Sequence, residues 1–245
     1  MREKIKNLVN FHLSLIGLKL IKKSRDALLS ERLMHMKNLG FSPQVIFDCG
    51  AYIGEWTLKA SEIFPKTQFL LVEPNTMVIN RTKANISDIR PKPILLEATA
   101  VGDNLGSGYL NIWANEHTSI EGSSLLSHVQ GEPKRKIAIE ILTLDSVSEK
   151  YNLKPDLVKL DLQGTELSAL KGTNNIMRTT TLFIIEFGCL EAYVNRTTPR
   201  ELMDIMYDNN YCLYDVVDLV YRPYDRALCG GDFFFIKKRQ SFKKI

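Results

Sequence analysis

The sequence predicts an α/β fold, in which helices flank a doubly wound and mostly parallel sheet. Two observations lead to this prediction. From residue 45 onward, short apolar runs of strand length alternate with segments that have helical periodicity. Four of the apolar runs also end at or beside an acidic residue, namely Asp48, Glu73, Asp161 and Glu186. Because ligands bind at the carboxyl ends of such strands, these side chains are expected to meet in one site.

The first part of the sheet is predicted to contain three strands. They are expected at residues 45–47, 68–72 and 94–101. A helix is expected at residues 55–64, because apolar residues recur there at helical spacing and Pro65 follows them.

An inserted β-hairpin with a long loop interrupts this alternation. Residues 108–113 and 136–141 alternate between apolar and polar side chains, as strands with one exposed face do. The polar stretch between them, residues 114–135, is long for a connection inside a compact domain. Loops of such length are usually functional or mobile, so we expect this one to help recognise the substrate.

The strand–helix alternation then returns and completes the sheet. Further strands are expected at residues 156–161, 182–187, 211–216 and 232–237. Helices are expected at residues 164–170 and 199–209. The second helix begins with Pro199, whose missing N–H group costs nothing in the first turn.

The size and composition of the chain fit one large domain preceded by a helical segment. The chain has 245 residues, of which 44% are hydrophobic and 24% charged, as is ordinary for a globular protein. We expect residues 41–245 to form the domain and residues 1–40 to pack on it. Residues 8–21 are apolar but shorter than the roughly 20 residues of a membrane span, and His12 and Lys19 interrupt them. Peripheral contact with a membrane stays open as an alternative for this segment.

The charge and the cysteines argue against several classes of protein. The net charge is +4, and much of the basic excess lies near the two ends. Solvated tails explain it more simply than a nucleic-acid or anionic-membrane footprint does. The four cysteines, Cys49, Cys189, Cys212 and Cys229, contain no C-x-x-C pair, so neither a metal site nor a redox motif is indicated. We expect buried free thiols in a reducing compartment, and hence a cytoplasmic protein.

A glycine-containing loop at residues 48–54 is the main functional motif. It joins a predicted strand to a predicted helix, where Gly50 permits a tight turn and Gly54 permits close approach of a ligand or of backbone. Glu73 follows Gly54 by 19 residues and ends the second strand, where an acidic residue hydrogen-bonds the ribose hydroxyls of a nucleoside. Together these features predict a nucleoside-type cofactor. The simpler alternatives are a turn-capping carboxylate at Asp48 and a solvated strand end at Glu73.

The charge of Asp48 and an incomplete glycine pattern distinguish between cofactors. The pyrophosphate of a dinucleotide binds N–H groups over this turn, and a carboxylate directly before Gly50 would repel it. S-adenosylmethionine has no phosphate but carries an ammonium and a sulfonium, which a carboxylate attracts. Tyr52 stands where G-x-G-x-x-G has its second glycine, and the P-loop pattern is absent. The loop therefore favours S-adenosylmethionine over NAD or a nucleoside triphosphate.

Several short motifs of this chain resemble the FkbM family of methyltransferases. They are Asp48-Cys49-Gly50-Ala51 with Gly54, Val72-Glu73-Pro74, Ala100-Val101-Gly102-Asp103, Leu142-Thr143-Leu144-Asp145, Val158-Lys159-Leu160-Asp161 continuing to Glu166, and Ile184-Ile185-Glu186. The resemblance covers about residues 45–187, and the block that ends at Glu166 is its most specific part. One departure is Tyr52, where the family usually has Asn.

The resemblance implies a Rossmann-like class I methyltransferase fold with a final antiparallel strand. It also implies S-adenosylmethionine as the cofactor and O-methylation as the usual activity, on sugars, glycans or secondary metabolites. A catalytically silent protein of the same fold that acts as a binding module is the main alternative, and Tyr52 is the feature that keeps it open. An NAD-dependent oxidoreductase is disfavoured by Asp48. No nucleic-acid partner is expected.

The predicted site combines the loop, the strand ends and the long polar loop. The residues expected to bind the cofactor are Asp48, Gly50, Ala51, Tyr52, Gly54, Glu73, Pro74, Thr99, Ala100 and Asp161. The residues expected to act in catalysis are Asp161, Glu186 and His117. The residues expected to bind the acceptor are Gln163, Glu166, Ser123, Ser124 and His128. No metal site is predicted, because no set of ligands is evident from the spacing.

Asp161 is expected to orient or deprotonate the hydroxyl acceptor, because a general base assists methyl transfer to oxygen. Each of these assignments has a simpler alternative. Asp161 could cap the following helix, and Glu166, expected as the third residue of that helix, could stabilise its dipole. Histidine is suited to base chemistry near neutral pH, which makes His117 and His128 candidates, but loop histidines are often only solvated.

Overall fold

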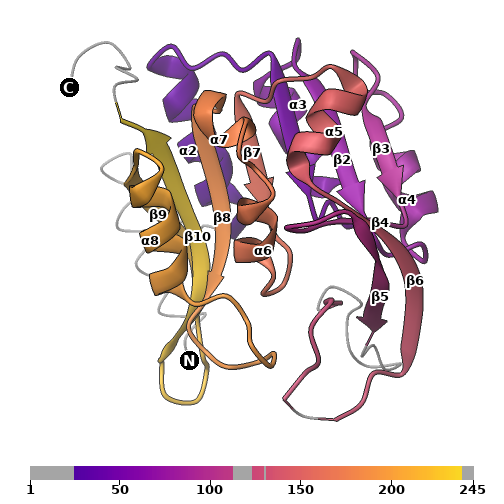
Figure 1. Cartoon of the computed structure of the whole chain (residues 1–245). Helices are drawn as coiled ribbons and strands as arrows, with labels where there is room; N and C mark the ends of the chain where they lie inside the picture. Colours follow the sequence, from indigo (N-terminus) through magenta and orange to yellow (C-terminus); the bar gives the residue numbers. More distant parts are fainter. Residues whose placement is uncertain (1–24, 113–122, 130, 239–245) are drawn as a thin grey trace, which may run out of the picture.

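The computed structural model describes residues 25–112, 123–129 and 131–238, and its main feature is a seven-stranded sheet (Figure 1). The strand order is β3-β2-β1-β7-β8-β10-β9. The pairs from β3 to β8 are parallel, whereas β10 is antiparallel to both of its neighbours. The strands are β1 (Val45–Cys49), β2 (Gln68–Glu73), β3 (Ile94–Glu97), β7 (Leu157–Leu160), β8 (Leu182–Gly188), β9 (Tyr211–Tyr221) and β10 (Leu228–Lys237). The predicted fold class is thereby confirmed.

Helices cover both faces of this sheet. One layer contains α2 (Arg25–Asn38), α3 (Glu55–Ile63) and α4 (Ile79–Asn85). The opposite layer contains α5 (Leu144–Tyr151), α6 (Glu166–Lys171), α7 (Ile176–Thr179) and α8 (Pro199–Asp208). Each layer packs on its own cluster of buried apolar side chains, so the main sheet lies between two helical layers with a hydrophobic core on each face.

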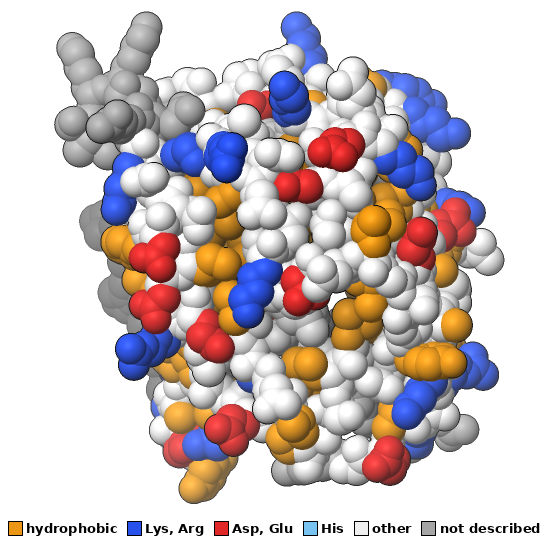
Figure 2. All heavy atoms as spheres, in the orientation of Figure 1, with side chains coloured by type: hydrophobic (Ala, Val, Ile, Leu, Met, Phe, Trp, Pro, Cys, Tyr) orange, Lys and Arg blue, Asp and Glu red, His pale blue; other side chains and the backbone are white. Residues whose placement is uncertain are grey.

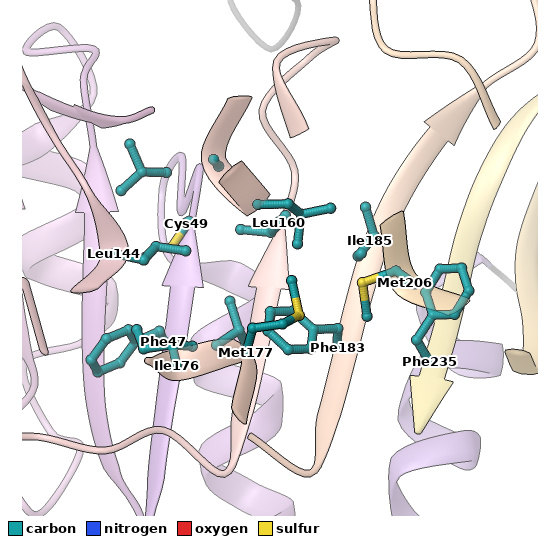
Figure 3. Close-up of a cluster of buried hydrophobic side chains, with 14 of the residues drawn as sticks. Phe47, Cys49, Leu144, Leu160, Ile176, Met177, Phe183, Ile185, Met206 and Phe235 are labelled. Atoms are coloured by element: carbon teal, nitrogen blue, oxygen red, sulfur yellow. The ribbon is translucent and has the colours of Figure 1, made fainter. Parts of the chain in front are cut away.

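The apolar strands are buried on both faces because neighbouring side chains point to opposite sides of a sheet. In β1, Phe47 packs in the cluster under α5 to α8, whereas Ile46 packs in the cluster under α2 and α3. Figure 3 shows the first cluster, in which Met177 and Met206 approach the sheet from the helices. Such double burial explains why the strands appear in the sequence as continuous apolar runs.

Local capping signals set the start of α8 where the sequence predicts it. Thr198 accepts a hydrogen bond from the backbone N–H of Glu201, and the Glu201 carboxylate accepts one from the backbone N–H of Thr198. This reciprocal arrangement is a capping box. Pro199 follows directly as the first helical residue.

The predicted strand at residues 94–101 is divided between two sheets, which corrects the prediction. Ala98 has a φ of 52°, and this left-handed residue ends β3 and redirects the chain. The next strand, β4 (Thr99–Val101), belongs to a second sheet of order β4-β6-β5, with β5 (Gly106–Ile112) and β6 (Arg135–Leu142). The β5–β6 pair is antiparallel, so the predicted hairpin is present. In Figure 1 it extends beyond the carboxyl ends of the parallel strands.

Two other predictions need correction. Helix α6 begins at Glu166, so Glu166 is its first residue and not the third. The cysteines are free, but burial was expected for all of them and only Cys49 is fully buried, whereas Cys189 is exposed. Cys189 lies just beyond the end of β8, where the chain leaves the core.

The described part of the N-terminal segment is helix α2, which packs on α3 and β9. Leu29, Leu33 and Met36 of this helix belong to the apolar cluster on that face of the sheet. Within the described ranges, no helix is long and apolar enough to cross a membrane. Residues 8–21, with His12 and Lys19, lie outside the described residues, so peripheral membrane contact stays a prediction.

Candidate active site

A cavity of about 380 Å³ lies at the carboxyl ends of the parallel strands. Its size falls within the roughly 300–1,000 Å³ of typical small-molecule sites. The loop after β1 and the end of β2 form one side, and the residues after β7 together with β8 and β10 form another. Residues 123–125 and helix α2 complete the wall. This is the edge at which the sequence places the acidic strand ends.

The loop after β1 is held against both neighbouring strands. The backbone N–H groups of Gly50 and Ala51 donate to the carbonyl of Val72, at 2.9 and 3.1 Å. Gly50 has a φ of 83°, and a Cβ atom there would lie 1.9 Å from the carbonyl oxygen of Asp161. Only glycine fits this contact, so Gly50 lets the loop after β1 touch the loop after β7.

Glu73 fixes the shape of the same loop from the end of β2. Its Oε2 atom accepts a hydrogen bond from the backbone N–H of Tyr52 at 2.6 Å, and its Oε1 atom accepts one from that of Asn75 at 2.7 Å. Each carboxylate oxygen has a further lone pair for a ligand. Burial raises the pKa of Glu73 to about 7, although both backbone hydrogen bonds act in the opposite direction.

Tyr52 adopts a conformation that is unusual for tyrosine. Its φ is 49°, in the left-handed region that glycine and asparagine tolerate best. Its backbone N–H is bound by Glu73, and its carbonyl accepts a hydrogen bond from Thr82 Oγ1 at 2.6 Å. The backbone contacts of the loop are therefore independent of the side chain at this position.

Asp48 lies beneath the loop and not on the cavity surface. The residue is fully buried, and its Oδ2 atom accepts a hydrogen bond from Thr57 Oγ1 at 2.6 Å. Burial raises the pKa of this carboxyl, and the neighbouring cation of Lys159 lowers it. Asp48 pairs with Lys159 across β1 and β7. A negative charge on Asp48 therefore acts mainly on Lys159, and a ligand in the cavity would not contact Asp48.

The opposite side of the cavity is a hydrogen-bonded group of side chains from β7 and β8. Gln163 Nε2 donates to Asp161 Oδ1 and to Glu186 Oε2, both at 2.9 Å. Lys159 Nζ donates to Asp161 Oδ2, also at 2.9 Å. The side chain of Asp161 is 33% exposed and that of Lys159 only 7%. A ligand in the cavity can therefore reach Asp161, whereas Lys159 supports it from beneath.

The sheet register aligns three carboxyl groups in one row. Leu160 pairs with Ile185, so Asp161 stands next to Glu186, and Glu186 pairs in turn with Asp232 of β10. Residues that pair across neighbouring strands share one face of a sheet. Asp161, Glu186 and Asp232 all line the cavity.

The surroundings shift the pKa values of two carboxyls in this row in opposite directions. Burial raises the pKa of Glu186 well above its ordinary value, and the charges of Asp161, Glu166 and Asp232 raise it further. Burial also acts to raise the pKa of Asp161, but the Lys159 cation and the hydrogen bonds from Lys159 and Gln163 outweigh it and lower that pKa. The surroundings therefore favour the ionised form of Asp161 over the ionised form of Glu186.

The structure brings most of the predicted site residues together. Those that line the cavity are Gly50, Ala51, Tyr52, Glu73, Pro74, Ala100, Ser123, Ser124, Asp161, Gln163 and Glu186. Ser124 also donates from Oγ to the carbonyl of Gln163 at 2.8 Å and accepts from the backbone N–H of Leu126, so it ties the polar loop to the acceptor side.

Other predicted residues lie away from the cavity lining. Gly54 packs on α4, where a Cβ atom would lie 2.9 Å from Ile86. Glu166 is buried, and its Oε1 atom accepts from the backbone N–H groups of Leu162 and Gly164, so it closes the loop before α6. The remaining ones are Asp48, Thr99 and His128, the last of which packs edge-on against Tyr193. His117 lies outside the described residues.

Among the cavity residues that were not predicted from the sequence, four carry polar groups that matter for the site: Trp56, Asn75, Lys159 and Asp232. The first two carry buried N–H groups, Trp56 Nε1 and Asn75 Nδ2, that have no hydrogen-bond partner within the described residues. A buried donor without a partner is costly, so both positions fit a ligand with acceptor atoms. The position of Asn75 directly after Glu73-Pro74 could have indicated in the sequence that it belongs to the site. Trp56 and Lys159 occupy positions that also suit core packing.

The cavity fits a nucleoside-type cofactor. Glu73 can accept hydrogen bonds from ribose hydroxyls, and the side chains of Trp56 and Asn75 can donate to ring nitrogens or a carboxylate. Among the described residues, no group of three or more His, Cys, Asp or Glu side chains is arranged to hold a metal ion.

Comparisons with known proteins agree with a site for a nucleoside-type cofactor. A family model described as the methyltransferase FkbM domain matches residues 48–214. No curated protein matches the chain in sequence.

Solved structures share the fold at low sequence identity. A Klebsiella pneumoniae protein assigned as an O-methyltransferase is 11% identical, with a TM-score of 0.50 over 95% of this chain and 90% of that one. An uncharacterised Listeria monocytogenes protein is 10% identical, with a TM-score of 0.50 over 91% and 72% of the two chains. M. capricolum TrmK, solved with S-adenosyl-homocysteine, is 14% identical, with a TM-score of 0.47 over 86% and 68%.

Proposed function

The chain belongs to the FkbM family of S-adenosylmethionine-dependent methyltransferases, and from this premise we propose that it methylates a hydroxyl group of a sugar, glycan or secondary metabolite. One observation carries the proposal. A single cavity joins the ribose-binding type of loop around Glu73 to an ionised carboxylate, Asp161, that is open to a ligand. A cofactor side and a proton-accepting side therefore share one space.

The chain's own residues supply the cofactor side. Glu73 is proposed to accept hydrogen bonds from the ribose hydroxyls, while the side chains of Asn75 and Trp56 donate hydrogen bonds to other polar atoms of the cofactor. S-adenosylmethionine, when bound, supplies an electrophilic methyl group on a sulfonium. The close contact between Gly50 and the Asp161 carbonyl brings the two sides of the cavity together, and such positioning can supply much of the catalysis.

The acceptor side favours a neutral hydroxyl compound. Asp161 is proposed to accept the proton of the acceptor hydroxyl, while Gln163 holds the Asp161 carboxylate in place. Asp218 and Asp232 add negative charge to the same wall. Carboxyl groups bind neighbouring hydroxyls of a sugar well but repel phosphate, so a polyol suits the cavity better than an anionic acceptor.

The absence of a nucleic-acid partner remains a prediction, and one face of the molecule is consistent with it. The face in Figure 2 carries basic and acidic side chains interspersed, and no basic stripe crosses it. A nucleic-acid footprint usually requires Lys and Arg side chains gathered on one face. The cytoplasmic location also remains a prediction.

Calorimetric titration with S-adenosylmethionine tests the cofactor side. Glu73→Ala is expected to weaken binding by at least about 100-fold, because it removes both the ribose acceptors and the support of Tyr52 and Asn75. The matched control is Glu97→Ala, since Glu97 pairs with Glu73 at the end of the next strand but forms an exposed ion pair with Lys83. Equal binding by both variants would contradict the assignment.

Mass spectrometry of host glycans and small metabolites, with and without the chain, tests the acceptor side. The gain of one methyl group on a hydroxyl is expected and would identify the acceptor. Cofactor binding without any methylated product across glycans and metabolites would instead favour the non-catalytic alternative.

A further inference from the structure

Lys159 is an almost fully buried cation in the cavity wall, and its Nζ atom is hydrogen-bonded to Asp161. Its Nζ atom donates to Asp161 at 2.9 Å and lies 5.8 Å from the centre of the Trp56 ring. Only 7% of its side chain is exposed. Burial of a lysine cation carries a large desolvation cost, which neighbouring carboxylates must offset.

Three carboxyl groups surround this cation. Asp48 faces Lys159 from β1, Asp161 from the position directly after the strand β7 that holds Lys159, and Asp232 from β10. Burial lowers the pKa of Lys159, but these three carboxylates outweigh that effect and raise it, so the side chain stays a cation and cannot serve as a base.

Glu186, the carboxyl that lies beside Asp161 in the sheet, has different neighbours from Asp161. Glu186 faces three other acidic side chains, those of Asp161, Glu166 and Asp232, and their negative charges disfavour its ionised form. Gln163 Nε2 bridges Asp161 and Glu186 without distinguishing between them, since both distances are 2.9 Å. The direct bond from Lys159 to Asp161 is therefore the contact that makes the two carboxyls unequal.

We propose that Lys159 is a positioning residue that acts through Asp161, by keeping Asp161 the ionised member of the Asp161–Glu186 pair. This inference rests on the proposed function and deepens it. The O–H bond of the acceptor breaks and its proton moves to an Asp161 oxygen. The electron pair left on the acceptor oxygen forms the bond to the methyl carbon, and the C–S electron pair leaves with sulfur. Glu186 takes no part in this proton transfer, and its Oε2 atom continues to accept a hydrogen bond from Gln163.

Carbon NMR of the Asp and Glu carboxyl groups tests this without any acceptor. The full chain is labelled, saturated with S-adenosyl-homocysteine and titrated with acid and base, and Asp161→Asn and Glu186→Gln assign the signals. In the unsubstituted chain, Asp161 is expected to titrate below its ordinary range and Glu186 well above it. In Lys159→Met, the Asp161 midpoint is expected to rise by about 1 to 3 pH units. Lys159→Arg keeps the charge and is expected to restore most of the shift.

A second variant covers the case in which Lys159→Met does not fold. Asp232→Asn removes a like charge from Glu186 but leaves the Lys159–Asp161 bond in place. The Glu186 midpoint is then expected to fall while that of Asp161 stays low. The inference is overturned if Asp161 titrates above Glu186 in the unsubstituted chain, or if Lys159→Met leaves the Asp161 midpoint unchanged. Because no acceptor enters the experiment, a failure of the O-methylation proposal would not alter this result.

Discussion

The two sides of the cavity are built in different ways. The cofactor side consists of two consecutive strand ends, at Asp48–Tyr52 and Glu73–Asn75, and its backbone N–H groups hold its shape by donating to the Val72 carbonyl and to the Glu73 carboxylate. The acceptor side joins Asp161 to Glu186 and Asp232 through the register of β7, β8 and β10, and side-chain bonds hold it. A backbone-built side tolerates an unusual residue such as Tyr52. On the acceptor side, replacement of any one charged side chain changes the hydrogen bonds and charges of the others.

The largest effect is expected on the acceptor side. Asp161→Asn removes the proposed proton acceptor, so transfer of labelled methyl groups into acceptors of a host extract should fall by about 100- to 10,000-fold. S-adenosylmethionine affinity should change only a few-fold. Asp103→Asn is the control, because Asp103 is exposed and lies outside the cavity lining. Retained transfer in Asp161→Asn would show that another group accepts the proton.

The contact between the two sides gives the next largest effect. Gly50→Ala forces a Cβ atom to 1.9 Å from the Asp161 carbonyl, and we expect a loss of about 3 kcal/mol or more in the free energy of unfolding. Urea denaturation measures it.

Two glycine controls separate the causes. Gly40→Ala has a positive φ of 99° but nothing within 4 Å, so it should cost about 1–2 kcal/mol. Gly106→Ala has neither feature and should change stability by less than about 0.5 kcal/mol. A Gly50→Ala loss no larger than that of Gly40→Ala would mean that the two sides do not touch.

The cofactor side should show a pH dependence that comes from Glu73. Its pKa in the folded chain is about 7, above the ordinary 4.5, so the folded state holds a proton over this range that the unfolded chain has released. Ionisation therefore costs stability as the pH rises towards 7, while binding of ribose hydroxyls by the carboxylate becomes stronger. Calorimetry should show about tenfold tighter S-adenosylmethionine binding at pH 8 than at pH 6. Glu73→Gln should lack this dependence; a dependence that persists would assign it to another group.

The smallest effect is expected at Tyr52. Its left-handed backbone, with a φ of 49°, suits asparagine better, so Tyr52→Asn should stabilise the fold by about 1 kcal/mol. Thermal unfolding measures this, with the exposed Tyr224→Asn as a control that has no such strain to relieve. A destabilised Tyr52→Asn would mean that side-chain packing at Tyr52 outweighs the strain.

Much of the fold could be predicted because its signals are local. Apolar runs buried on both faces set the parallel strands, and a capping box sets the start of α8 at Pro199. The division of the third strand at Ala98 could not be predicted, since the left-handed turn there depends on the second sheet that β4 joins. Propensity carries no information about such a partner.

By itself, the sequence determined the alternation of strands and helices that builds the main sheet, the loop at Asp48–Gly54 and the acidic strand ends. Only the tertiary structure decided which of these groups face one another. The register of β10 sets Asp232 beside Glu186, although 46 residues separate them, and β1 sets Asp48 beside Lys159 beneath the loop. The physical reason is that protonation and charge pairing depend on burial and distance in space, which a residue acquires from its neighbours in the sheet and not from its neighbours in the chain.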